Sequence, residues 1–287
     1  MSRIEQALEK AAKMRLGVTE NQVGYVSAAR LKPTPPQTSP EIFTPPEGSL
    51  KINNPTLVAA TNPQSPMAEE YRKLKEMVIK LTRNDLTKNT LMVTSSMVGE
   101  GKTTTALNLA ISLAQEYDHT VLLIDADLRR PCIMQYLGLD TKPGLTDCLL
   151  EKAQVSDVLV KTGIGKLTVL PSGRKAPNPG ELFSSRKMRE LVREMKHRYA
   201  ERYIIIDTPP VLPFAETRSL SGIVDGVIMV VKSGLSTLEN IRDAQYAMSG
   251  AHILGLVYNH AKPESLSSSY SYYYKNDYVE YGEALSR

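Results

Sequence analysis

Residues 91–105 read LMVTSSMVGEGKTTT, and this stretch decides the fold that we expect. It begins as a short apolar strand, continues as a loop that contains glycines, and leads into an apolar helix from Ala106 to Ala114. The N-terminus of a helix presents unpaired N–H groups and a positive dipole, both of which favour phosphate oxygens. Ser96 stands where the common pattern begins with glycine, but the order strand, loop and helix predicts a phosphate-binding loop.

The residue types in this loop indicate a nucleotide together with its metal ion. Gly99 and Gly101 let the backbone close around phosphate oxygens, and Lys102 can reach the β- and γ-phosphates. The Thr103 hydroxyl is a suitable ligand for Mg²⁺. We therefore predict an ATP and Mg²⁺ site whose nucleotide-binding residues are Met97, Val98, Gly99, Glu100, Gly101, Lys102, Thr103 and Thr104.

Carboxylates follow two later apolar stretches. VLLIDADLRRP ends a predicted strand in Asp125 and Asp127, and YIIIDTPP ends another in Asp207. Ligands of open parallel sheets bind at the carboxyl ends of the strands, so these side chains should lie beside the phosphate loop. One such residue is commonly a loop start or a helix cap, whereas three in a chain with a phosphate loop favour metal and proton chemistry. We predict that Thr103 ligates Mg²⁺ directly and that Asp127 and Asp207 hold it directly or through water.

From Thr90 onward, short apolar strands alternate with longer amphipathic helices. This alternation predicts an α/β fold of the P-loop NTPase type, a mostly parallel sheet with helices on both faces. We predict strands at 90–94, 120–124, 167–170, 202–206, 226–231 and 252–257. One helix begins near Met67, and further helices are predicted at 103–117, 184–199 and 236–249.

The regions before and after this alternation differ in composition. Residues 1–16 have the pattern of a short amphipathic helix, which is either a frayed terminus or a docking element. Residues 17–66 contain half of the 18 prolines and no apolar period, so we expect a disordered linker. The P-loop domain is predicted to span 67–260, and a tyrosine-rich tail follows at 261–287.

The bulk composition excludes several classes of protein. The net charge of +4 is too small a surplus to indicate nucleic-acid binding. The two cysteines, Cys132 and Cys148, lack metal-site spacing, and no apolar run approaches the roughly 20 residues of a membrane span. We expect a cytoplasmic protein with two free thiols and no nucleic-acid partner.

Together, these motifs resemble the bacterial tyrosine kinases (BY-kinases), P-loop kinases related to the ParA/MinD ATPases. The resemblance rests on SSMVGEGKT (95–103), DADLR (125–129) and IIIDTPP (204–210), which occur in the order of the family's Walker A, A′ and B motifs. Two further segments, PNPGELFSSRKM and GLVYN, agree with it. The similarity covers the chain from Met67 onward, and the N-terminal sequence resembles the stand-alone autokinases of exosortase-linked exopolysaccharide loci.

This resemblance implies a protein-tyrosine autokinase that uses Mg-ATP and regulates exopolysaccharide or capsule synthesis or export. It implies that Lys102 and Asp125 are catalytic, with Asp125 accepting or orienting the phenolic proton. The stretch SSSYSYYYKNDYVEYGE would otherwise be a low-complexity tail, but the family arrangement makes it the substrate, phosphorylated by another subunit. The expected phosphoacceptors are Tyr270, Tyr272, Tyr273, Tyr274, Tyr278 and Tyr281.

The resemblance also implies partners. The family's oligomerisation motif, Glu-x-x-Arg-x-x-Arg, corresponds to Glu69, Arg72 and Lys75, and lysine lacks the bidentate fork of arginine. A ring-like homo-oligomer would therefore be held differently here. A membrane polysaccharide co-polymerase would activate the kinase and hold it peripherally at the inner membrane, and a tyrosine phosphatase would reverse the reaction. Val98, where proline is frequent, and Glu216, where aspartate is usual, depart from the family pattern.

Two other functions compete with this interpretation. A ParA/MinD-type partitioning or positioning ATPase shares the expected fold, but its signature lysine early in the loop is replaced here by Met97. A non-catalytic, nucleotide-sensing scaffold would have no need to keep Lys102 together with all three strand-end aspartates. We therefore expect a kinase, with phosphotyrosine formation as the property that separates the three functions.

Overall fold

The computed structural model describes residues 52–83, 88–140, 142–176, 178–198 and 202–261. The predicted helix at 1–16, the linker up to residue 51 and the tyrosine tail from residue 262 lie outside the described residues. What we expect of these segments stays a prediction.

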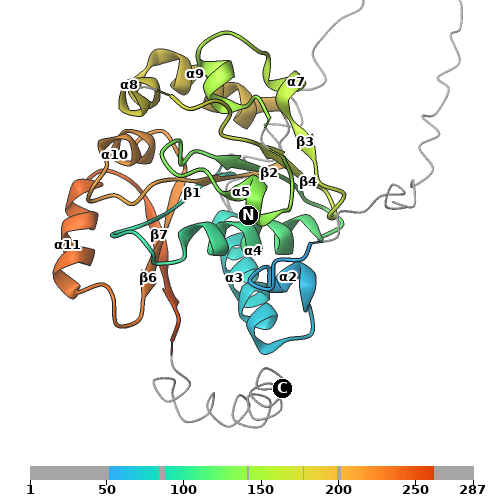
Figure 1. The fold of residues 1–287 in the computed structure, drawn as a ribbon. Coiled ribbons are helices and arrows are strands. Elements are labelled where there is room, and N and C mark those ends of the chain that lie inside the picture. The colour runs from blue at the N-terminus through green and yellow to red at the C-terminus, as the bar shows by residue number, and fades with distance from the viewer. Residues whose placement is uncertain (1–51, 84–87, 141, 177, 199–201, 262–287) are drawn as a thin grey trace, which may run out of the picture. The chain divides into compact units, whose positions relative to one another are not determined.

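A seven-stranded sheet forms the centre of the described region, in the order β3-β4-β2-β5-β1-β6-β7 (Figure 1). Neighbouring strands run parallel except at one edge, where β3 pairs antiparallel with β4. The predicted α/β fold with a mostly parallel sheet is therefore confirmed. The strands are β1 (Thr90–Ser95), β2 (Thr120–Asp125), β3 (Val160–Lys161), β4 (Leu167–Leu170), β5 (Arg202–Asp207), β6 (Gly226–Lys232) and β7 (Ile253–Asn259).

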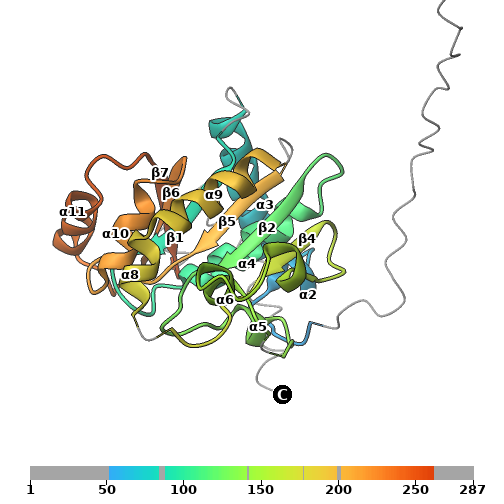
Figure 2. The same cartoon turned by 90° about the horizontal axis from the view of Figure 1, so that it is seen from above.

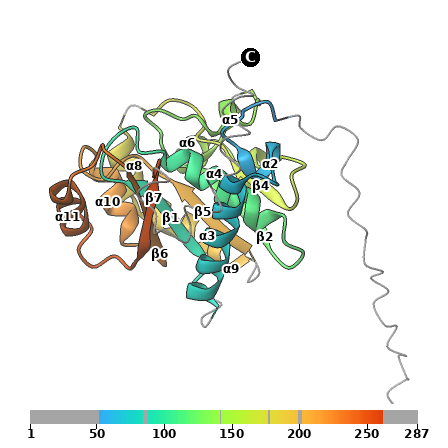
Figure 3. The ribbon, with the colours of Figure 1, turned by 90° about the horizontal axis from the view of Figure 1, so that it is seen from below.

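Helices cover both faces of the sheet. Figure 3 views the face that carries α2 (Val58–Thr61), α3 (Pro66–Thr82) and α4 (Lys102–Ala114). Figure 2 views the opposite face, with α8 (Pro179–Ser184), α9 (Arg186–Arg198), α10 (Ala215–Ser221) and α11 (Leu238–Ala247). Three shorter helices are α5 (Ile133–Tyr136), α6 (Leu145–Leu149) and α7 (Val155–Val158). They are too short to produce an apolar period that would predict them from the sequence.

The strands bury side chains on both faces, which explains their nearly continuous apolar sequences. In β1, Met92 packs into the layer beneath α8 to α11, whereas Leu91 and Val93 pack against α4. Every residue of α4 from Thr105 to Ala114 is buried. Because α4 is enclosed in this way, the loop that precedes it is held against the carboxyl ends of the strands.

The last part of the predicted linker is packed, and this prediction needs correction for residues 52–65. Leu57 is fully buried, and Ala59 in α2 is buried as well. Asn108 of α4 accepts a hydrogen bond from the Ala59 N–H at 2.9 Å and donates one to the Thr56 carbonyl at 2.9 Å. A short apolar segment can pack here because Asn108 satisfies backbone groups that burial would otherwise leave unpaired.

α3 begins with a cap that the sequence displays. The Ser65 hydroxyl accepts a hydrogen bond from the Ala68 N–H at 3.1 Å, and Pro66 occupies the first helical position. At 17 residues, α3 has polar residues throughout. No helix in the described part of the chain is long and apolar enough to cross a membrane.

Candidate active site

The phosphate loop lies between β1 and α4, and its backbone shape depends on glycine. Gly99 and Gly101 have φ angles of 87° and 91°, in the left-handed region that other residues rarely adopt. A Cβ atom on Gly101 would also lie 2.1 Å from Nδ2 of Asn259. Gly101 is the N-cap of α4, so the N–H groups of the first three helical residues, Lys102 to Thr104, have no partners within the helix. This is the geometry of a phosphate-binding loop.

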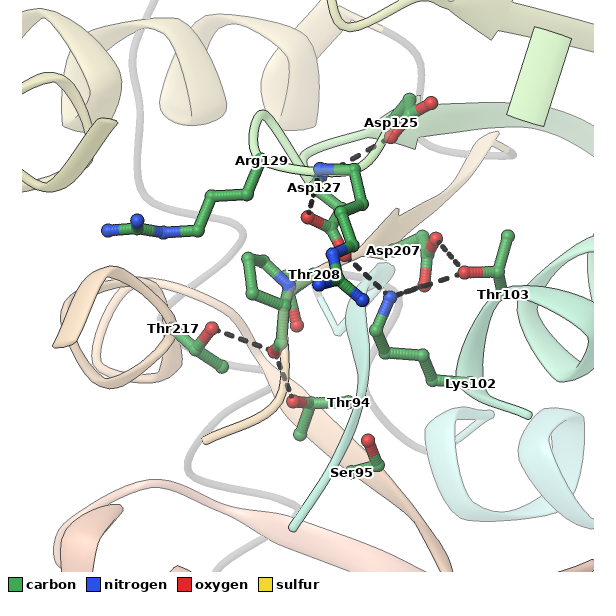
Figure 4. A network of polar contacts seen from close by, with 12 residues as sticks. Thr94, Ser95, Lys102, Thr103, Asp125, Asp127, Arg129, Asp207, Thr208 and Thr217 are labelled. Carbon is green, nitrogen blue, oxygen red and sulfur yellow. Dashed lines mark hydrogen bonds and ion pairs between the residues drawn. The ribbon is translucent and has the colours of Figure 1, made fainter. Parts of the chain in front are cut away.

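The strand register brings the predicted carboxylates to this loop. Asp207 at the end of β5 lies directly beside Asp125 at the end of β2. Nζ of Lys102 donates to Oδ2 of Asp127 at 2.8 Å, and the Thr103 hydroxyl donates to Oδ2 of Asp207 at 2.7 Å (Figure 4). The residues predicted for catalysis and for metal binding therefore meet at one edge of the sheet.

This cluster contains an excess of buried negative charge. Asp125, Asp127 and Asp207 are 1%, 5% and 0% exposed. Nζ of Lys102 lies 2.8 Å from Asp127 and 3.9 Å from Asp207. Burial lowers the pKa of Lys102, but the charges of Asp207 and Asp127 outweigh this effect and raise its pKa overall. A single ammonium group cannot balance three carboxylates, so the site needs further positive charge or protons.

Asp207 shows where such charge would bind. Burial raises the pKa of Asp207 to about 6, against the opposing effects of Lys102 and Thr103. Its Oδ1 atom has no hydrogen-bond partner among the described residues. Leaving a buried acceptor unpaired costs about 1–3 kcal/mol, and more for a charged group. The orphaned oxygen therefore indicates a site built for a cation.

The ligand types fit Mg²⁺. Asp127, Asp207 and the Thr103 hydroxyl offer only oxygen atoms, which is the ligand type this ion prefers. Within the described residues, no group of three or more histidine, cysteine or acidic side chains is arranged to hold a metal by itself. Mg²⁺ commonly takes one or two carboxylates and completes its shell with phosphate oxygens and water, so this sparse set is suitable.

Asp125 has a strongly raised pKa. Burial raises it to about 8, and the neighbouring charge of Asp207 contributes to the increase. Its carboxyl oxygens accept hydrogen bonds from the N–H groups of Asp127 at 3.3 Å and Ile133 at 3.2 Å. In the metal-free protein at neutral pH, Asp125 is therefore mostly protonated. The role of proton acceptor requires positive charge near Asp207 to lower this pKa.

Two residues predicted to bind the nucleotide make contacts inside the protein. The Glu100 side chain is fully buried, and its carboxylate accepts the Met97 N–H at 2.6 Å. The Ser95 hydroxyl donates to the Met97 carbonyl at 2.7 Å. The Met97 N–H is therefore not free for a phosphate, and the Glu100 side chain does not face the nucleotide side of the loop.

The structure adds side chains at the edge of the site that the motifs did not assign. Arg129 forms an ion pair with the buried Glu216 of α10 and lies over the Phe214 ring at 4.5 Å, directed away from Lys102 (Figure 4). Cys132 also lies at this cluster, and burial raises its pKa to about 11, which keeps the thiol protonated. Arg129 belongs to the motif DADLR, whereas Cys132 and Glu216 have no spacing from which their positions at the site could be predicted.

The three residues of the predicted oligomerisation motif differ in exposure: two lie on the surface and one is buried. Glu69 and Arg72 form a surface ion pair at 2.5 Å on α3, and Arg72 also donates to the Pro63 carbonyl at 2.6 Å. Lys75 is 7% exposed and forms an ion pair with Glu116 within the same chain. The predicted phosphoacceptor tyrosines lie outside the described residues.

Comparison with known proteins identifies the family. Residues 88–252 match the AAA domain family. The tyrosine-protein kinase YwqD of Bacillus subtilis is 38% identical over 223 residues, covering 77% of this chain and 92% of that protein. The putative tyrosine-protein kinase CapB of Staphylococcus aureus is 29% identical over 217 residues, covering 75% and 93%. The structure of the kinase domain of the Escherichia coli tyrosine kinase ETK aligns with a TM-score of 0.66 at 29% identity, covering 72% and 82%.

The similarity extends over nearly the full length of the first two kinases and includes the phosphate loop and the acidic strand ends. The predicted family is confirmed: this chain belongs to the bacterial tyrosine-protein kinases.

Proposed function

We propose that this kinase phosphorylates the tyrosines of its own C-terminal tail, and that it does so between subunits of an oligomer. One observation carries the proposal: Lys102, Asp127 and Asp207 meet at the phosphate loop, in a chain whose last 18 residues contain six tyrosines. In the reaction a phenolic oxygen bonds to the γ-phosphorus of ATP and the bond to the bridging oxygen breaks. ADP, phosphotyrosine and a proton are the products.

Each residue at this edge has a role in that transfer. Backbone N–H groups that follow Gly99 would hold the phosphates, and Thr103, Asp127 and Asp207 would hold Mg²⁺, which neutralises charge on the transferred group. Lys102 would exchange Asp127 for the β- and γ-phosphates. Asp125 would then lose its proton, because the charge of Asp207 is compensated, and would accept or orient the phenolic proton.

The proposal extends to assembly and regulation. Glu69 and Arg72 on the surface of α3 would contact a neighbouring subunit in a ring-like oligomer. Each phosphate adds about −1.5 to −2 charge, so phosphorylated tails would repel one another and the acidic site, and the oligomer would disperse. A tyrosine phosphatase would reset the cycle. A membrane co-polymerase would activate the kinase at the inner membrane, and the cycle would control exopolysaccharide or capsule synthesis or export.

The decisive test is an anti-phosphotyrosine blot of the purified full chain after incubation with Mg-ATP. We expect labelling of the wild type and none for Asp125→Asn. Replacing all six tail tyrosines by phenylalanine should remove most labelling and leave nucleotide binding intact. A matched control is Tyr246→Phe, since this tyrosine on α11 is 85% exposed but lies outside the tail; it should be labelled like the wild type.

Three results would overturn the proposal. Strong labelling of the variant without tail tyrosines would exclude the tail as the main acceptor. ATP hydrolysis without any phosphotyrosine would indicate an ATPase of the partitioning type. Labelling that appears only after another kinase is added would indicate a nucleotide-sensing scaffold.

A further inference from the structure

A buried carboxylate closes the phosphate loop from the inside. Oε2 of Glu100 accepts hydrogen bonds from the Ser96 hydroxyl at 2.9 Å and from the Met97 N–H at 2.6 Å. Glu100 is 0% exposed. The side chain thus connects the end of the loop to its beginning.

The other carboxylate oxygen connects this loop to a distant turn. Oε1 of Glu100 accepts hydrogen bonds from the Ser236 hydroxyl and from the Lys232 N–H, the latter at 3.3 Å. Lys232 is the last residue of β6, and Ser236 lies directly before Thr237, the N-cap of α11. We name residues 232–236 the β6–α11 turn. One carboxylate therefore joins two segments that are more than 130 residues apart.

A second contact holds the same loop from β7. Nδ2 of Asn259 donates to the Glu100 carbonyl at 2.8 Å, and the Asn259 carbonyl accepts the Ser233 N–H of the β6–α11 turn at 2.9 Å. The close approach of Asn259 to Gly101 leaves no room for a side chain at that position. The phosphate loop is thus held by the ends of β6 and β7, in addition to β1 and α4, which it connects.

A negative charge at this place needs a reason. A carboxylate beside the site of a triphosphate repels the ligand, and burying it costs free energy unless it is hydrogen-bonded. Four donors surround Glu100, so its carboxylate fixes the loop and the segments around it. Loop N–H groups that do not contact Glu100 are thereby held in place, and donors that are already in place bind phosphate without reorganisation.

We propose that Glu100 is a positioning residue, which sets the shape of the phosphate loop by tying it to the β6–α11 turn through Ser236. Nucleotide affinity then depends on this turn, although it lies outside the family motifs. The inference concerns nucleotide binding alone, and it stands or falls independently of whether the tail is the phosphoacceptor.

The test compares Glu100→Gln, Ser236→Ala and the double variant in the full chain, with the Kd for Mg-ADP measured by calorimetry. A glutamine amide would point a donor at one of the four donors, so we expect the Kd to rise about tenfold or more. Ser236→Ala should raise the Kd about threefold to tenfold, and Ser236→Thr, which keeps the hydroxyl, should restore it. Both substitutions break the same contact, between Ser236 and Glu100. The Kd of the double variant should therefore rise by less than the product of the two single increases.

Steady-state kinetics and a matched control separate positioning from general stability. In Glu100→Gln the KM for ATP should rise by a larger factor than kcat falls. The control is Asp225→Asn at the opposite end of β6, where Asp225 accepts the Thr90 N–H and pairs with Lys196. This variant should lower Tm and leave the Kd within twofold of the wild type.

Two results would overturn the inference. One is a Glu100→Gln protein with lowered Tm and wild-type Kd, and the other is fully multiplicative effects of Glu100→Gln and Ser236→Ala. If Glu100→Gln does not fold, Ser236→Ala decides alone, because it removes a single hydroxyl; an unchanged Kd in that variant would refute the proposal.

Discussion

The active-site edge and the outer helix α3 handle charge in opposite ways. At the phosphate loop, Lys102 faces buried carboxylates that outnumber it, and Oδ1 of Asp207 has no hydrogen-bond partner among the described residues. On α3, Arg72 pairs with a glutamate one turn away, and Lys75 pairs with Glu116. The first cluster is incomplete without a bound cation, whereas the second is already balanced within the chain.

The difference shows how each region should respond to change. An uncompensated buried charge costs several kcal/mol, so removing or adding charge at the active site has large effects. Exposed ion pairs contribute about 0–1 kcal/mol, and a subunit contact through α3 would exchange one partner for another at little cost. The following variants test this contrast, beginning with the largest expected effect.

Replacing Lys102 by methionine should have the largest effect. The variant removes the cation that would neutralise the transferred phosphoryl group, so the phosphotransfer rate should fall by about 10²–10³-fold or more. The initial rate with γ-labelled ATP measures this. Lys187→Met is the control, since Lys187 lies on the surface of α9, where it pairs with Glu151. The phosphotransfer rate of this variant should match that of the wild type. A rate within tenfold of the wild type for Lys102→Met would refute the assignment.

Removing Mg²⁺ should have the next largest effect. A ligand present at 100 times its Kd stabilises a protein by about 2.7 kcal/mol, which corresponds to a Tm increase of about 5–10 °C for a domain of this size. We expect Mg-ADP to produce this increase in the wild type, and EDTA to abolish it. Asp207→Asn should lose most of the magnesium-dependent increase in Tm. An equal response of Asp207→Asn and the wild type would exclude Asp207 as a ligand.

The metal-free protein should lose stability as pH rises. The pKa values of Asp125 and Asp207 are raised to about 8 and about 6 in the folded state, against roughly 3.9 in the unfolded chain. Between these values the folded state binds more protons than the unfolded state, so the free energy of unfolding falls as pH rises from about 4 to 8.

Asp125→Asn isolates the contribution of one carboxyl group. Because an amide does not ionise, we expect the variant to be more stable than the metal-free wild type at pH 8, by about 1 kcal/mol or more, and closer to it at pH 5. Urea denaturation in EDTA at both pH values measures the difference. A wild type that becomes more stable toward pH 8 would contradict the raised pKa of Asp125.

The smallest effect is expected on α3. Glu116→Gln removes one of the two carboxylates that pair with Lys75; because Glu76 stays as a partner of this buried ammonium group, the free energy of unfolding should change by no more than about 1 kcal/mol. This substitution should also increase the assembled fraction in light scattering, because Lys75 can then pair with a neighbouring subunit. Glu76→Gln serves as the control, since Glu76 is the more exposed of the two partners of Lys75. Equal assembly of the two variants would exclude competition by Glu116.

Much of the fold and of the site could be predicted from the sequence. The strand, loop and helix around Lys102 form from residues close together in the chain, and the parallel topology then places Asp125 and Asp207 side by side. The residues near Leu57 could not be predicted to pack, because their proline-rich surroundings indicate disorder. The distant Asn108 and Gln115 of the α4 region provide hydrogen bonds that satisfy backbone groups of this segment and make its burial favourable.

The sequence alone predicted the chemistry of the site: which residues would bind phosphate, hold Mg²⁺ and move a proton. That information is local, because it depends on residue type and on spacing along one strand, loop or helix. The tertiary structure decided which of these groups are free to act. The Met97 N–H is hydrogen-bonded to the Glu100 carboxylate, and Lys75 is paired with Glu116. The pKa of Asp125 is raised to about 8. Burial and long-range contacts determine these outcomes, and both depend on segments that meet only after the chain has folded.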